Sequence, residues 1–118
     1  MKFSLVIPCF NESANLPLLL EKCKPVIDLP ECEVILVNNG STDNTAEVLK
    51  ALLPKYLGCR SIFIEKNQGY GFGILEGLRS SKAEFIGWTH ADMQTDPKDI
   101  IKGLAIIEDS GTDVFIKG

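Results

Sequence analysis

The sequence predicts an α/β fold in which helices cover both faces of a mostly parallel sheet. Short apolar runs rich in β-branched residues alternate with longer segments whose apolar residues recur every three or four positions. This alternation is typical of βαβ units, and continuous apolar runs are typical of strands that are buried on both faces. With 118 residues, 45% of them apolar, the chain is long enough to bury the core of one domain. We therefore expect a three-layer, Rossmann-like sandwich.

The expected elements alternate along the whole chain. Strands are predicted at residues 3–8, 33–37, 61–64, 85–89 and 114–116. Helices are predicted at residues 14–23, 44–53, 71–79 and 97–108, with start signals at Ser13, Asp43 and Asp96. Crossovers between parallel strands are right-handed, so a chain that reverses direction after its third strand gives the strand order 3-2-1-4. In that order the loops after strands one, two and four meet at one crevice.

Charge and cysteine content exclude several classes of function. The net charge of −4 and the pI of about 4.9 argue against a nucleic-acid partner, because phosphate backbones are bound by clustered Lys and Arg. The four cysteines form no C-x-x-C pair, which argues against a zinc or redox motif and fits a reducing cytoplasm. The apolar run at residues 3–7 is too short for a signal peptide or a membrane span. The chain stops after its fifth apolar run, and we expect a domain truncated at its C-terminus.

The loop after the first strand lacks the glycines of dinucleotide-binding and phosphate-binding loops. This weakens a dehydrogenase or kinase interpretation. Taken alone, Asn11 and Ser13 are best explained as a helix cap, with Glu12 favoured by the helix dipole.

The next two loops each have a structural and a functional interpretation. After the second strand, Gly40 supplies a turn with positive φ and Asp43 or Asn44 caps the following helix. A turn does not require two adjacent asparagines, and the side-chain amides of Asn38 and Asn39 could contact a base or a ribose. Further along, the alternating glycines at positions 69, 71 and 73 serve either tight packing of the helix or the close approach of a ligand.

The loop after the fourth strand carries the strongest candidates for a metal site. Alternating residues, if extended, project to one side, and here they are His90, Asp92, Gln94 and Asp96. Asp96 precedes a proline and is explained as a helix cap, whereas Asp92 has no such explanation. His90, the only histidine, is either a buried group or a ligand.

Taken in order, four segments resemble the family-2 glycosyltransferases of the GT-A fold. They are residues 4–12 (SLVIPCFNE), 37–45 (VNNGSTDNT), 67–71 (NQGYG) and 90–97 (HADMQTDP). The ending is most similar to the branch that moves a sugar onto a polyprenyl phosphate, such as dolichyl-phosphate mannose synthases. The resemblance implies nucleotide contacts at Pro8, Asn11, Glu12, Asn38, Asn39, Asn67, Gly71 and Ala91. It implies a metal site at Asp92, with Gln94 and His90 as further ligands.

The resemblance also implies a reaction and its partners. The whole protein is expected to use Mg or Mn and a UDP- or GDP-linked sugar, and to glycosylate a lipid phosphate or a glycan at the cytoplasmic face of the membrane. Residues 1–118 are expected to be the donor-binding part, without the acceptor half and its catalytic groups, and inactive alone. If the truncated sheet exposes apolar surface, the chain is expected to form homo-oligomers.

The chain departs from the family pattern in ways that leave a second interpretation open. Asn38 and Asn39 stand where the family usually has two aspartates, and His90 replaces the first acid of its Asp-x-Asp motif. Each change removes a negative charge, and an imidazole ligand would favour manganese over magnesium. The alternative is therefore a non-catalytic binding or interaction module that retains the fold.

Overall fold

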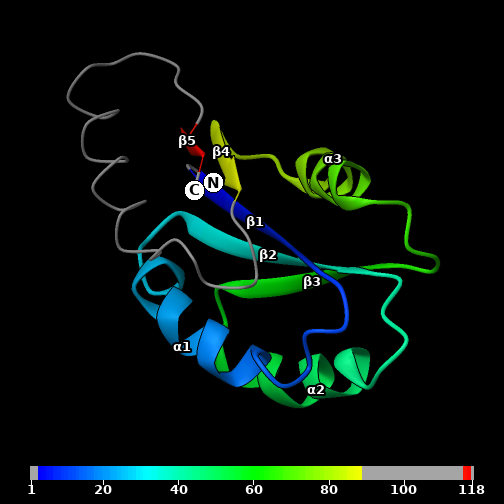
Figure 1. The fold of residues 1–118 in the computed structure, drawn as a ribbon. Coiled ribbons are helices and arrows are strands. Elements are labelled where there is room, and N and C mark those ends of the chain that lie inside the picture. The colour runs from blue at the N-terminus through cyan, green and yellow to red at the C-terminus, as the bar shows by residue number, and fades with distance from the viewer. Residues whose placement is uncertain (1–2, 89–115, 118) are drawn as a thin grey trace.

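The computed structural model describes residues 3–88 and 116–117, and it contains a sheet flanked by helices (Figure 1). The strands are β1 (Phe3–Cys9), β2 (Cys32–Asn39), β3 (Cys59–Ile64), β4 (Phe85–Trp88) and β5 (Ile116–Lys117). The helices are α1 (Leu16–Ile27), α2 (Thr45–Leu52), the short 3-10 helix η1 (Leu53–Lys55) and α3 (Tyr70–Ser80). The helix predicted at residues 97–108 lies outside the described residues.

The sheet has the order β3-β2-β1-β4-β5, and all of its strand pairs are parallel. This confirms the predicted order 3-2-1-4, and it places β5 beside β4. In Figure 1, α1 and α2 cover one face of the sheet and α3 covers the other. The predicted three layers are therefore present.

Burial explains why β1 occupies the centre of the sheet. All seven of its residues are buried, as expected for a parallel strand covered on both faces. Leu5 and Ile7 belong to the core beneath α1 and α2, whereas Val6 packs in a second core with Phe72 of α3. Within the described ranges, no helix has the length and apolar character required to cross a membrane.

The boundaries of α1 differ from the prediction. The helix begins at Leu16 and continues to Ile27, because its buried apolar face extends through Val26 and Ile27 beyond the predicted end at residue 23. The predicted start signal at Ser13 is wrong: Asn15 occupies the N-cap position, and its side chain makes no capping hydrogen bond.

The second helix starts as the sequence indicated. Asn44 occupies the N-cap position of α2 without a side-chain hydrogen bond, but the neighbouring Asp43 accepts one from the Thr45 N–H at 2.9 Å. Asp43 also accepts a short hydrogen bond from the Thr45 hydroxyl. Asp43 therefore satisfies a backbone donor in the first turn, which is the purpose of a cap.

Close packing explains two glycines of α3, and Gly73 is one of those for which the sequence left packing and ligand approach open. A Cβ at Gly77 would lie 2.3 Å from Val6 Cγ1, and one at Gly73 would lie 3.3 Å from Pro8 Cβ. Both positions are therefore explained by close packing of α3 on the sheet. A Cβ at Gly71 would meet no atom within 4 Å, so packing does not account for that glycine.

We expect Gly77→Ala to lower the free energy of unfolding by about 1–3 kcal/mol, because the added methyl group clashes with buried Val6. The matched control Gly71→Ala adds the same group to the same helix in open space, and it should raise the free energy of unfolding by up to about 1 kcal/mol. Urea denaturation measures both. Equal effects of the two changes would contradict the packing described for α3.

Candidate functional site

The carboxyl ends of β1, β2 and β3 meet at one edge of the sheet, where open parallel sheets bind their ligands. Three loops leave this edge, at residues 10–15, 40–44 and 65–69. Each loop contacts the next one, and polar side chains or a glycine make every contact.

Asn11 joins the first loop to the second. Its φ of 52° lies in the left-handed region, which asparagine tolerates better than most residues. Its Oδ1 accepts hydrogen bonds from the N–H groups of Thr42 (2.7 Å) and Asp43 (3.2 Å), and its own N–H donates to Ser41 Oγ at 3.0 Å. The expected helix cap at Asn11 is thus wrong, because its side chain reaches across to the loop after β2.

A second contact lies beside the first. Ser13 Oγ donates to Asp43 Oδ2 at 2.9 Å, which explains why Ser13 does not cap α1. The pKa of the exposed Asp43 carboxyl lies below its ordinary value, chiefly because the Thr45 hydroxyl donates to it and also because Thr45 N–H and Ser13 donate. Asp43 therefore remains ionised and accepts hydrogen bonds from both sides of the junction.

Gly40 brings the second loop into backbone contact with the third. Its φ is +67°, and a Cβ there would lie 2.0 Å from the Asn67 nitrogen and 2.6 Å from the Lys66 carbonyl carbon. No side chain fits in that space, and a positive φ disfavours other residue types in addition. The predicted positive φ at Gly40 is confirmed, and the close approach of Asn67 is the further reason for glycine.

The side chain of Asn39 connects the end of β2 to the start of α3 through hydrogen bonds. The side chain is 3% exposed, its Nδ2 donates to the Gly69 carbonyl at 2.8 Å, and its Oδ1 accepts a long hydrogen bond from Gln68 N–H at 3.4 Å. A carbonyl only accepts, so the bond to Gly69 fixes which end of the amide is the donor. Asn67 is also engaged locally, because its Oδ1 accepts from Gly69 N–H at 2.8 Å.

Asn38 lies on the other face of the sheet. The sequence placed both asparagines in the turn after β2, but the structure places them inside the strand, where successive side chains point to opposite faces. Asn38 is also 3% exposed, and its Oδ1 is buried with no hydrogen-bond partner among the described residues. Leaving such a group unpaired costs about 1–3 kcal/mol. The structure thus brings Asn39, but not Asn38, to the α3 side.

Of the other predicted nucleotide contacts, some are buried or hydrogen-bonded within the protein and one is exposed. Pro8 is buried in β1 next to Gly73, and Glu12 accepts a hydrogen bond from Asn15 Nδ2 at 2.9 Å. Gly71 is exposed. Cys9, the last residue of β1, is buried, and this burial, followed by the charge of Glu12, raises the pKa of its thiol, so the thiol stays protonated.

The predicted metal ligands Asp92, Gln94 and His90, and the predicted nucleotide contact Ala91, lie outside the described residues. In residues 3–88 and 116–117, no group of three or more His, Cys, Asp or Glu side chains could hold a metal ion. Strand β4 runs parallel to β1 and therefore ends at the same edge as the three loops.

Sequence reasoning missed the contacts that hold the loops together. Ser41 and Thr42 were assigned only to a turn, yet both bind Asn11 across 30 or more positions of sequence. The only available signal was the unusual density of short polar residues in residues 38–45.

Comparisons with known proteins agree with this geometry. The family model for glycosyl transferase family 2 matches residues 4–117. The undecaprenyl-phosphate 4-deoxy-4-formamido-L-arabinose transferase of Serratia proteamaculans (strain 568) is 33% identical over 118 residues, a match that covers 96% of this chain and 35% of that protein. The chain thus spans about a third of the length of the curated relatives that it matches.

Solved structures show the same fold. TarS of S. aureus, in complex with UDP-GlcNAc, superposes with a TM-score of 0.78 at 26% identity, covering 92% of this chain and 32% of that one. Mannosyltransferase PcManGT of Pyrobaculum calidifontis, in complex with GDP-Man and Mn2+, has a TM-score of 0.78 at 19% identity, covering 90% and 32%. These superpositions confirm the predicted GT-A fold. Since the family model covers nearly the whole sequence, the chain belongs to glycosyl transferase family 2.

Proposed function

We propose that this chain is the nucleotide-sugar-binding part of a transferase that moves a sugar from a UDP- or GDP-linked donor to a polyprenyl phosphate or another membrane-linked acceptor. The observation that carries the proposal is the set of three interlocked loops at the carboxyl edge of the sheet, with the Asn39 amide held in one orientation. The proposed acceptor class is supported by the names of the relatives, which specify undecaprenyl phosphate. We place the whole protein at the cytoplasmic face of the membrane.

The orientation of Asn39 suits a base that carries a ring N–H. Nδ2 gives one of its two N–H groups to the Gly69 carbonyl, and the orientation that this fixes leaves the oxygen of this largely buried amide with acceptor capacity for a ligand. An amide oxygen accepts two hydrogen bonds, and the long bond from Gln68 uses only one. Uracil and guanine have a ring N–H to donate at this position, whereas cytosine and adenine have an acceptor nitrogen. The geometry therefore favours the bases of UDP and GDP.

The open position at Gly71 suits the diphosphate. It lies in the first turn of α3, where backbone N–H groups without helical partners favour an anion, and no acidic residue occupies that turn. The absence of a side chain at Gly71 lets a ligand approach the backbone.

Asp92, with Gln94 and His90 as further ligands, would hold Mg or Mn. Carboxylate and amide oxygens suit either cation, and an imidazole ligand shifts the preference toward Mn. A bound divalent cation supplies charge neutralisation for the nucleoside diphosphate as it leaves. A phosphate acceptor needs no strong general base, so the residues of this chain serve to bind and orient the donor.

We expect UDP or GDP to bind only in the presence of Mn2+ or Mg2+, and we expect Asp92→Asn to weaken that binding at least about tenfold. The reason is that the two phosphates and the acidic chain repel each other unless a cation lies between them. Calorimetric titration with and without the metal measures this. Unchanged affinity without metal would contradict the assignment of Asp92, and no binding at all would favour a non-catalytic module.

The preference for a ring N–H gives a second prediction. For whichever of UDP and GDP binds, the analogue with an acceptor nitrogen, CDP or ADP respectively, should bind about tenfold more weakly, which corresponds to about 1.4 kcal/mol. Asn39→Leu should abolish this preference. Competition titrations on both proteins test it, with thermal melts as the control for folding. A preference that survives in Asn39→Leu would assign base selection to another residue.

The contact between the first two loops gives a third prediction. Asn11→Gly keeps the left-handed backbone but removes the side chain, so the Thr42 and Asp43 amides should lose their acceptor and exchange with deuterium about tenfold faster. Asn11→Asp retains the accepting oxygen and is the matched control. Native-state hydrogen exchange measures the rates. Slow exchange in Asn11→Gly would mean that Asn11 does not hold the second loop.

A further inference from the structure

One face of β2 carries polar side chains at both of its ends. Residues that alternate along a strand share a face, and on β2 these are Glu33, Ile35, Val37 and Asn39. The two middle residues, Ile35 and Val37, belong to the apolar core on the α3 side. Asn39, at the carboxyl end, binds the Gly69 carbonyl at the start of α3. Glu33 lies at the amino end of the strand, on the same face, and takes part in the contacts that hold the other end of α3.

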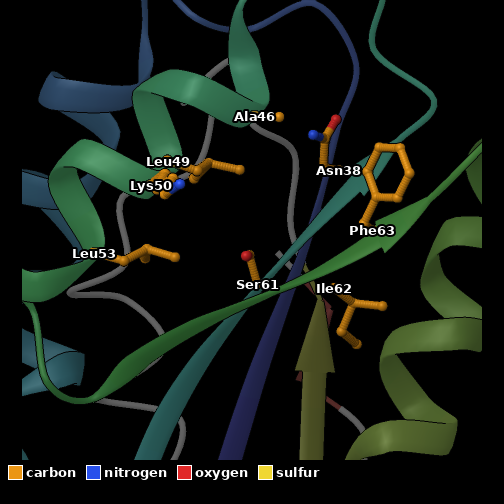
Figure 2. Close-up of a pocket in the computed structure, with 8 residues that line it drawn as sticks. All are labelled: Asn38, Ala46, Leu49, Lys50, Leu53, Ser61, Ile62 and Phe63. Atoms are coloured by element: carbon orange, nitrogen blue, oxygen red, sulfur yellow. The ribbon is translucent and has the colours of Figure 1, made fainter.

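Arg60 of β3 holds the carboxyl end of α3. Figure 2 shows Ser61 on the side of α2 and Ile62 on the side of α3, so Arg60, two residues before Ile62, also faces α3. Its Nη2 donates to the Ser80 carbonyl at 2.9 Å and lies 3.3 Å from Ser80 Oγ. Ser80 is the last residue of α3, where the carbonyl groups have no partner within the helix. The guanidinium therefore satisfies one of these carbonyls and places a positive charge where the helix dipole favours it.

Glu33 and Ser4 fix the guanidinium and the residue that follows the helix. Glu33 accepts from Arg60 Nη2 at 3.2 Å and from Nε at 3.4 Å, and its side chain is 14% exposed. Ser4 is fully buried and gives its single O–H to Glu33 Oε1 at 3.0 Å. The 2.7 Å contact between Ser4 Oγ and Ser81 Oγ then has Ser81 as its donor. Three neighbouring strands thus hold the carboxyl end of α3 through one chain of hydrogen bonds.

Close packing connects this end of α3 to the donor site. Ser80 Oγ donates to the Gly77 carbonyl at 3.0 Å, and Gly77 and Gly73 are the two positions at which α3 lies directly on β1. The helix has 11 residues and is therefore about 16 Å long. Packed secondary elements of this kind can transmit a change at one end to the other. The position of Ser80 therefore bears on the position of Gly71 in the first turn.

We propose that Arg60 is a positioning residue for the donor site, because it sets where the first turn of α3, at Gly71, presents its backbone N–H groups. This inference rests on the proposed function, which assigns that turn to the diphosphate. Arg60 itself binds Glu33 and Ser80 at the opposite end of α3, so it acts on the nucleotide through the helix.

The test compares Arg60→Met with Arg79→Met by calorimetric titration of UDP and GDP in the presence of Mn2+. Arg79 is the matched control, because it carries the same charge on the same helix, but its ion pair with Glu76 lies within α3. We expect Arg60→Met to weaken nucleotide binding about fivefold and Arg79→Met to weaken it less than about twofold. The titrations are made well below the thermal midpoint of each variant, where every variant is folded and a loss of stability alone does not lower the affinity.

A second variant and a second readout separate positioning from folding. Arg60→Lys leaves Glu33 a cationic partner but lacks the planar fork that binds Glu33 and Ser80 together. Its nucleotide affinity should lie between those of the unsubstituted protein and Arg60→Met, with a thermal midpoint close to that of the unsubstituted protein. NMR should show a shift of the Gly71 backbone amide resonance in Arg60→Met, at the far end of the helix, and no shift in Arg79→Met.

The outcomes distinguish this inference from the proposed function. If the unsubstituted protein binds neither nucleotide, the proposed function fails and this inference fails with it. If it binds one of them and Arg60→Met loses no more affinity than Arg79→Met, only the inference is overturned. An unchanged Gly71 resonance in Arg60→Met would overturn it as well, since the first turn would then be independent of Arg60. Should Arg60→Met not fold, Arg60→Lys decides, and an affinity equal to that of the unsubstituted protein contradicts the inference.

Discussion

The complete burial of β1 is the constraint on which the rest of the structure depends. Every residue of Phe3–Cys9 is buried, and the strand is paired on one side with β2 and on the other with β4. Since its side chains alternate between two separate cores, β1 must have a helical layer on each face. A parallel strand in that position has its carboxyl end where neighbouring loops converge, and this fixes where a ligand can bind.

Polar contacts, and not a hydrophobic core, join the loops of the proposed donor site. Its loops have little apolar packing, and polar contacts hold them instead: Asn11 to the second loop, Gly40 against Asn67, and Asn39 to Gly69. Asn11, Gly40 and Gly69 all have positive φ, which only a few residue types tolerate. A scaffold built in this way holds binding groups in place at an edge where a hydrophobic core cannot extend.

The sequence predicted the layers and the strand order because both depend on simple rules, namely apolar runs that need burial on two faces and crossovers with one hand. It predicted the positive φ of Gly40 from turn chemistry alone. It missed the contacts of Asn11, because a hydrogen bond to a residue 31 positions away leaves no local pattern. The end of β2 was missed for a related reason. Asparagine is rare in strands, and Asn38 and Asn39 belong to β2 because they pair with residues of β1 and β3, which are distant in the sequence.

The surroundings of Asn38 and Asn39 suit neutral amides better than carboxylates. Asn39 must donate to the Gly69 carbonyl, and a carboxylate there would place two acceptors against each other. The Oδ1 atom of Asn38 is buried without a hydrogen-bond partner among the described residues, and a charge there would cost far more to bury than a neutral amide. The loss of charge therefore fits the local surroundings at both positions. The missing charges therefore do not by themselves argue against the proposed nucleotide site, because the surroundings of both residues favour a neutral amide.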